Sequence, residues 1–269
     1  MYKFHTDSFF TIGHTHEVCQ DYAFSGITPN GIPYAVVTDG CSSSTGAVDF
    51  GARIMAHAIK GIIEDVGHNK YCSDGVIQMV IHDLKSAMVS SIHEFGLSME
   101  DFLVTIQAVF IWNNEVFYLM YGDGVHMLDW DFMSWEFSSG APYYLGYEIG
   151  GMRGSYMAQF GEFPVHLADH TGKTPEPHTV EEYIDDVTYR AFRKPLANST
   201  TKYAVGSDGL KSFSLAGASC STEWVVDEVM SIKNFNYGFL KRRMKRFLST
   251  DTLKHYDDVS VAMIISEKL

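Results

Sequence analysis

The sequence is poor in cysteine, in long apolar runs and in basic charge, and each shortage excludes a class of protein. Its four cysteines are scattered and form no CxxC pair, which argues against a structural zinc site or a disulfide framework and favours a reducing cytosol. No stretch approaches the roughly 20 apolar residues that span a bilayer, so no membrane association is expected. The N-terminus has no basic segment followed by a long apolar run, so we expect no secretory signal.

Acidic residues outnumber basic ones by 33 to 20, which gives a net charge of −13. Nucleic-acid binding needs a basic face, so we do not expect nucleic acid as a partner. Solubility is the simplest explanation of this acidity, and carboxylates clustered to hold cations are the alternative. A basic run at 241–246 is expected to be a solvated helix face, with a phosphate- or partner-binding patch as its alternative.

What is present is a regular series of strand patterns, in which apolar residues alternate or run together before turn residues. They lie at residues 34–40, 105–112, 115–124, 203–210 and 257–265. Asn113 and Asn114 separate the second pattern from the third. Asparagine tolerates positive φ, so this pair predicts a β-hairpin.

Helical spacing of apolar residues lies between these strand patterns, at 46–64, 76–95 and 222–248, the last with a break near 237–238. A polar stretch at about 165–200 predicts a surface insertion in a single domain that spans residues 1–269. Because the order lacks a strict strand–helix–strand rhythm, it favours an α+β fold of antiparallel sheets covered by helices.

Aspartate recurs at the ends of the strand patterns. Asp39 ends the first, Asp123 and Asp208 end two others, Asp257 opens the last, and Asp21 precedes another short apolar stretch. Glycine follows three of them and lets the chain turn away. Carboxylates that converge at one rim repel each other, so their pKa values rise unless cations neutralise them.

Oxygen ligands of this kind suit Mg²⁺ or Mn²⁺. Two such ions roughly 3.5–4 Å apart can bridge a hydroxide and a phosphoryl oxygen. A single Asp-Gly most often marks only a turn, and spacing alone does not show that the aspartates meet. Their repetition at strand ends is what favours a metal site.

In chain order the sequence contains "CQDYAF", "AVVTDGCSSS…GA", "YLMYGDGVHML", "AVGSDGL" and "YDDVSVAMII". This ordered set resembles the motifs of the metal-dependent protein phosphatases of type 2C, the PPM family, in a bacterial or phage-like variant. The likeness runs from about Gly13 to Ile265. It implies a four-layer α-β-β-α sandwich with two central antiparallel sheets.

The resemblance also implies a role for most of the aspartates. Asp39 would bridge two catalytic Mg²⁺ or Mn²⁺ ions, and Gly40 would offer a backbone carbonyl to one of them. Asp208 and Asp257 would ligate the other ion.

Three further aspartates take secondary roles by the same resemblance. Asp21 would hold a metal-bound water and contribute to catalysis. Asp123 occupies the position associated with a third, weaker ion. Asp258 replaces a common asparagine and would act behind the ligands.

Four positions depart from the family pattern. Gln20 replaces a carboxylate, Cys41 replaces a histidine, and the glycines that usually follow become Ser42 and Ser43. Cys41 is expected to be a small packing residue. A cysteine-dependent phosphatase would have an arginine in the loop after it, and "CSSSTGA" has none.

Two histidines precede the first motif, where many members of the family have an arginine that grips phosphate. His16 is predicted to contact the substrate phosphate or to protonate the leaving oxygen, and His14 is the weaker candidate. An ordinary histidine pKa near 6.5 permits either role at neutral pH. A structural or solvated histidine is the alternative for both.

The sequence therefore predicts a metal-dependent phosphatase that hydrolyses phosphoserine or phosphothreonine in a phosphoprotein with a metal-activated water. The alternative is a catalytically weak or inactive phosphatase-like module that binds a phosphoprotein or a regulatory partner, which Gln20 and the missing arginine favour. A third possibility is an enzyme that uses the same chemistry on a small phosphorylated metabolite.

Overall fold

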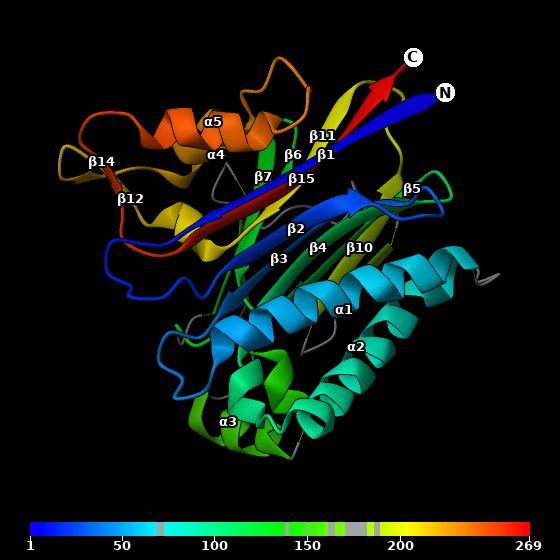
Figure 1. The fold of residues 1–269 in the computed structure, drawn as a ribbon, viewed down its shortest axis with the longest axis vertical. Helices are drawn as coiled ribbons and strands as arrows, with labels where there is room; N and C mark the ends of the chain where they lie inside the picture. Colours follow the sequence, from blue (N-terminus) through cyan, green and yellow to red (C-terminus); the bar gives the residue numbers. More distant parts are fainter. Residues whose placement is uncertain (69–72, 138–139, 150, 161–164, 170–181, 186–188) are drawn as a thin grey trace.

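Two six-stranded antiparallel sheets form the centre of the computed structural model, which describes all residues except 69–72, 138–139, 150, 161–164, 170–181 and 186–188 (Figure 1). In spatial order, the first sheet contains β1 (Tyr2–Thr11), β15 (Val259–Lys268), β11 (Thr201–Gly206), β6 (Gly124–Leu128), β7 (Asp131–Phe137) and β8 (Val165–Asp169). The second contains β2 (Tyr22–Ile27), β3 (Pro33–Gly40), β4 (Val104–Trp112), β5 (Glu115–Tyr121), β10 (Arg190–Pro195) and β9 (Glu182–Asp185).

Helices cover the outer face of each sheet, and a small third sheet completes the fold. In the described part of the chain the α-helices are α1 (Val48–His68), α2 (Ser73–Phe95), α3 (Met152–Phe160), α4 (Thr222–Met230) and α5 (Phe239–Leu248). The small sheet contains β13 (Ala218–Ser219), β12 (Phe213–Leu215) and β14 (Leu253–His255). Figure 1 shows α1 and α2 on one side of the paired sheets and α4 and α5 on the other.

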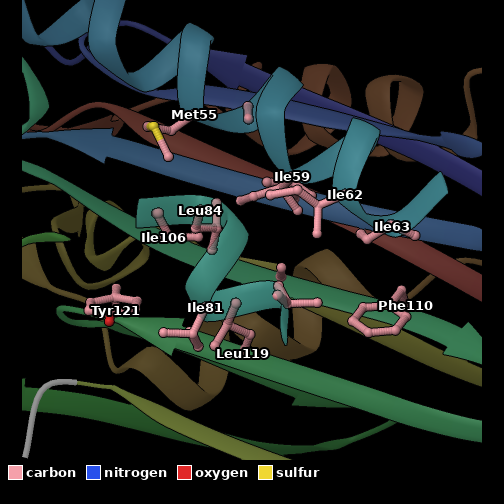
Figure 2. Close-up of a cluster of buried hydrophobic side chains, with 14 of the residues drawn as sticks. Met55, Ile59, Ile62, Ile63, Ile81, Leu84, Ile106, Phe110, Leu119 and Tyr121 are labelled. Atoms are coloured by element: carbon pink, nitrogen blue, oxygen red, sulfur yellow. The ribbon is translucent and has the colours of Figure 1, made fainter. Parts of the chain in front are cut away.

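Three hydrophobic clusters hold these layers together. One lies between the sheets and includes Val37 and Val109 of the second sheet and Ile264 of the first. Another joins α1 and α2 to the second sheet, and Figure 2 shows Ile59 and Leu84 over Ile106 in it. A third joins α4 and α5 to the first sheet. This α-β-β-α order confirms the expected α+β sandwich.

The local patterns account for most of these elements. Asn113 and Asn114 have φ values of 55° and 61° and link β4 to β5, as the hairpin prediction requires. The apolar stripe of α1 lies against β3 and is fully buried at Met55 and Ile59. The predicted break in the third helix is also confirmed, since residues 231–238 separate α4 from α5.

The basic run at 241–246 lies on α5, and its apolar partner Met244 is buried. Arg243 pairs with Glu228 of α4, and the other four basic side chains are exposed. The helix is therefore amphipathic and turns a charged face to solvent, as expected.

The sequence analysis missed β1, a ten-residue strand that pairs along its whole length with β15. Its mixed sequence, YKFHTDSFFT, carries little strand signal, and the strand depends on the ladder that β15 offers.

The predicted insertion at about 165–200 lies partly outside the described residues, at 170–181 and 186–188. Within the described residues of this range, β8 pairs with β7 and β10 pairs with β5. The insertion and the single-domain boundaries stay predictions. No helix in the described ranges has both the length and the apolar character needed to cross a membrane.

Candidate metal centre and active site

The predicted aspartates of the site stand at or next to strand ends. Asp39 is the penultimate residue of β3, and Asp21 directly precedes β2 beside it. Asp208 follows β11 in the other sheet and opens a short 3-10 helix, Asp208–Lys211. Asp257 lies just before β15, and Asp123 lies between β5 and β6. Because the two sheets are stacked, these ends from different sheets can share one rim of the sandwich.

The aspartates are close enough to influence each other's protonation. Burial raises the pKa of Asp39 well above its usual value, and the charges of Asp21, Asp208 and Asp123 raise it further. Burial also raises the pKa of Asp257, and Asp208 adds to this effect. Carboxylates from the two sheets therefore lie near enough for their charges to interact, and a shared metal site stays a prediction.

Asp21 is held by the first sheet although it belongs to the second. Its side chain is buried, and its Oδ2 accepts a hydrogen bond of 2.7 Å from Ser207 Oγ. The Ser207 hydroxyl oxygen in turn accepts a hydrogen bond of 3.1 Å from the backbone N–H of Ser260. Oδ1 of Asp21 is buried and has no hydrogen-bond partner in the described structure. Burial raises the pKa of Asp21 to about 7, against the lowering effect of the Ser207 bond.

Asp123 projects from a turn with unusual backbone angles. The glycines on either side, Gly122 and Gly124, have φ values of 74° and 152°. Both angles lie in the region that L side chains rarely adopt. Burial raises the pKa of Asp123 to about 7, with Asp208 raising and Lys211 lowering it.

Asp258 fixes the position of the loop between β1 and β2, which leads into the site. Its buried carboxylate accepts two hydrogen bonds, one of 2.7 Å from the N–H of Gly13 and one of 2.6 Å from the N–H of Gln20. The backbone carbonyl of Gln20 also accepts a hydrogen bond of 3.2 Å from the N–H of Gly40. Asp258 thus joins β15 to the loop before β2, which agrees with a position behind the ligands.

His16 contacts two carboxylates in this arrangement. Its Nδ1 lies 3.1 Å from Asp258 Oδ2, and its Nε2 lies 3.4 Å from Asp257 Oδ1. Burial alone would lower the pKa of His16, but Asp258, Asp257 and Asp21 outweigh it and raise the pKa. The imidazole therefore adjoins a predicted metal ligand. His14 is exposed, and its Nδ1 lies 2.8 Å from the carbonyl of His255.

The loop after Asp39 brings a tyrosine that the sequence analysis missed. Gly40 packs so closely on α1 that a Cβ there would lie 2.9 Å from Val48. The Cys41 N–H donates 2.8 Å to the Leu103 carbonyl, which fixes the start of the loop. Tyr144 lies beside Cys41; burial raises the pKa of its hydroxyl, and Cys41, Asp39 and Asp123 add to the effect. Tyr144 belongs to none of the ordered motifs, so no local pattern marks it.

The chemistry of this donor set suits a hard divalent cation. The aspartates offer carboxylate oxygens, of which Oδ1 of Asp21 is buried and unpartnered, and burial and neighbouring carboxylates raise the pKa values of Asp39 and Asp123. The described residues nevertheless contain no group of three or more His, Cys, Asp or Glu side chains already arranged to hold a metal. A cation would draw the carboxylates together, since it replaces their mutual repulsion with attraction.

Comparisons with known proteins agree with this fold. Residues 13–131 match the family model described as protein phosphatase 2C. One similar solved structure is a serine/threonine phosphatase of S. agalactiae, with a TM-score of 0.58 and 14% identity over 97% of this chain and 99% of that one. The catalytic domain of the serine/threonine phosphatase PstP, solved with two manganese ions, has a TM-score of 0.55 and 12% identity over all of both chains.

A third structure, the serine/threonine phosphatase Stp1 of Staphylococcus aureus, has a TM-score of 0.55 and 13% identity over 98% of this chain and 94% of that one. No curated protein sequence matches the chain. Residues 13–131 are thus similar to the protein phosphatase 2C family model, and the chain shares its fold with these serine/threonine phosphatases along almost its whole length.

Proposed function

We propose that this protein is a metal-dependent phosphatase that removes phosphate from serine or threonine of a phosphoprotein in the cytosol. The observation that carries the proposal is the environment of Asp39, a half-buried carboxylate whose pKa is raised by burial and by the charges of Asp21, Asp208 and Asp123. Such a group of like charges is costly unless a cation neutralises it.

Most of the metal ligands come from four positions. Asp39 and the carbonyl of Gly40 would hold one ion, and Asp39, Asp208 and Asp257 would hold the second. When bound, a pair of Mg²⁺ or Mn²⁺ ions supplies an activated water and offsets charge on the phosphoryl group.

The remaining residues act around that pair. Asp21, fixed by Ser207, would orient the attacking water through its free oxygen. Asp123 would hold a third, weaker ion. His16, with its raised pKa, would protonate the leaving alkoxide or contact the substrate phosphate.

The test is a phosphatase assay on matched phosphoserine, phosphothreonine and phosphotyrosine peptides, with Mn²⁺ and then with EDTA. We expect Mn²⁺-dependent release of phosphate from the first two peptides and much less from the third. Activity that survives chelation would reject the metal assignment. Activity confined to phosphotyrosine or to small phosphate esters would reject the substrate class.

A phosphatase-like binding module is the second candidate, and the position of His16 favours it. His16 already lies against Asp257 and Asp258, so an imidazole occupies part of the space around a predicted ligand. A protein that binds a phosphoprotein without Mn²⁺ and releases no phosphate from it would support this candidate.

A further inference from the structure

A buried pair of side chains, Gln107 and His126, lies directly behind the Asp123 turn. Gln107 is a residue of β4 and His126 a residue of β6, so the pair connects the two sheets. Both side chains are at most 1% exposed. A buried amide and a buried imidazole are costly unless their polar atoms have partners, so their contacts indicate what the pair does.

The amide of Gln107 makes a chain of hydrogen bonds that ends at the turn. Its Nε2 donates a hydrogen bond of 2.7 Å to the backbone carbonyl of Asp123 and a longer one of 3.4 Å to the carbonyl of Tyr121. Its Oε1 lies 3.0 Å from Nε2 of His126. Because that oxygen can only accept, His126 must donate from Nε2. Burial lowers the pKa of His126 to about 3, which leaves a neutral ring with a single N–H.

The carbonyl of Asp123 can only accept, so it determines which way the amide of Gln107 points, and the amide oxygen in turn requires the N–H of His126 to be on Nε2. An amide rotated by 180° would place its NH₂ against the His126 N–H and its oxygen against the Asp123 carbonyl, so both contacts would be lost. Nδ1 of His126 has no hydrogen-bond partner in the described structure. The imidazole is thus kept in the core for one bond, the bond to Gln107.

Steric contacts confine the same turn. A Cβ on Gly124 would lie 2.7 Å from the Gln107 side chain, and a Cβ on Gly122 would lie 2.7 Å from Thr105. Thr105 and Gln107, which lie on the same face of β4, therefore confine the turn beneath Gly122 and Gly124. With the carbonyl of Asp123 fixed, the direction of its carboxylate toward Asp208 is restricted.

We propose that Gln107 and His126 are positioning residues that set the affinity of the Asp123 carboxylate for a divalent cation. This inference rests on the proposed function, since it needs a metal centre at the rim. Groups that orient a ligand from behind it typically change metal affinity by about 10- to 100-fold when they are lost. Neither residue touches the reacting groups, so their effect should pass through Asp123 alone.

The test is a double-mutant cycle on Mn²⁺ affinity, measured by isothermal titration calorimetry on the full chain. Gln107→Met keeps the length of the side chain and removes both polar contacts. We expect it to weaken the Mn²⁺ ion that Asp123→Asn also weakens, by about 10-fold or more. In the Asp123→Asn background, Gln107→Met should cause no further loss.

Two more variants keep the test decisive. Gln107→Glu retains the acceptor for His126 but sets an oxygen against the Asp123 carbonyl, and it replaces Gln107→Met if that variant does not fold. His126→Phe retains the ring and removes only the bond to the amide oxygen of Gln107, so we expect a smaller loss of Mn²⁺ affinity. Melting temperatures in EDTA report any plain loss of stability separately.

The outcomes separate this inference from the proposed function. If the wild-type chain binds no Mn²⁺, the proposed metal centre fails. If it binds Mn²⁺ and Asp123→Asn weakens an ion, but the Gln107 variants bind normally, only the positioning role is overturned. Equal losses with and without the Asp123 carboxylate would also overturn it, since they would reveal a structural effect.

Discussion

The two sides of the carboxylate centre differ in what balances their charge. On one side, Asp21 is buried and Asp39 and Asp123 are half-buried, and burial raises the pKa of each. On the other side, Asp258 accepts hydrogen bonds from two backbone N–H groups and lies beside His16. The fold itself stabilises the charge of Asp258, and the first side is where the proposed cation would bind.

This difference distinguishes residues that could bind a metal ion from residues that stabilise the fold. A residue whose charge the fold leaves unbalanced is available to a metal ion, and its removal should harm function more than stability. A residue whose charge the fold already satisfies is part of the scaffold, and its removal should harm stability first. The predictions below test this division, from the largest expected effect to the smallest.

Asp39→Asn should abolish catalysis while leaving the fold intact. The change removes the shared ligand of both ions, so we expect hydrolysis of p-nitrophenyl phosphate with Mn²⁺ to fall by about 10³-fold or more, or about 4 kcal/mol of transition-state stabilisation. Removing a negative charge that other carboxylates repel should not lower the melting temperature in EDTA. The control is Asp251→Asn, an exposed aspartate outside the site. Near-normal turnover in Asp39→Asn would show that the unbalanced side holds no catalytic metal.

Asp258→Asn should instead destabilise the protein. An asparagine can accept only one of the two N–H groups of Gly13 and Gln20, and its NH₂ would oppose the other. We expect a loss of about 2–3 kcal/mol in the free energy of unfolding, measured by urea denaturation without metal. Asp257→Asn is the matched neighbour and should change stability by no more than about 0.5 kcal/mol. Equal losses in both variants would erase the distinction between the two residues.

The metal-free protein should lose stability as the pH rises. Asp21 and Asp123 have folded pKa values raised to about 7 from an ordinary value of 3.8, so the folded state binds more protons than the unfolded state in this range. Their contribution is complete below about pH 4 and disappears as the pH passes through about 7. We expect the melting temperature in EDTA to fall by a few degrees over this interval, and Mn²⁺ to reverse the fall near neutral pH. A flat profile in EDTA would contradict the unbalanced charge.

His16→Gln should have the smallest effect, and that effect should depend on pH. The folded pKa of His16 is raised, so its pairing with Asp257 and Asp258 contributes stability below about pH 6.5 and loses it as the pH rises through the higher folded value. The variant should therefore lose more stability at pH 6 than at pH 9, measured by thermal unfolding in EDTA. His14→Gln, at an exposed position, is the control. An equal loss of stability at both pH values would show that His16 stabilises the fold through packing and not through its charge.

Much of the fold could be predicted from local sequence. The pair Asn113–Asn114 marks a hairpin because positive φ is a property of the residue itself, and the stripe of α1 is visible because one face of a helix must be buried. The strand β1 shows the limit of this reasoning. Its residues have little strand character, and it exists because β15 lies alongside it for ten residues.

The candidate site divides in the same way. The Asp-Gly pairs at strand ends mark Asp39, Asp123 and Asp208 as candidates, and their order along the chain resembles a known family. No local pattern marks Ser207, Gln107, His126 or Tyr144, because each acquires its role from a partner in another strand or loop.

The sequence alone determined the residue types and their order: aspartates followed by glycines at the ends of apolar strands, in a chain with excess negative charge. These are local properties, set by side-chain chemistry and backbone freedom. Only the tertiary structure decided which aspartates meet and which of them the fold already balances. Burial and the distance between charges control that outcome, and both depend on how two sheets stack, which no single segment encodes.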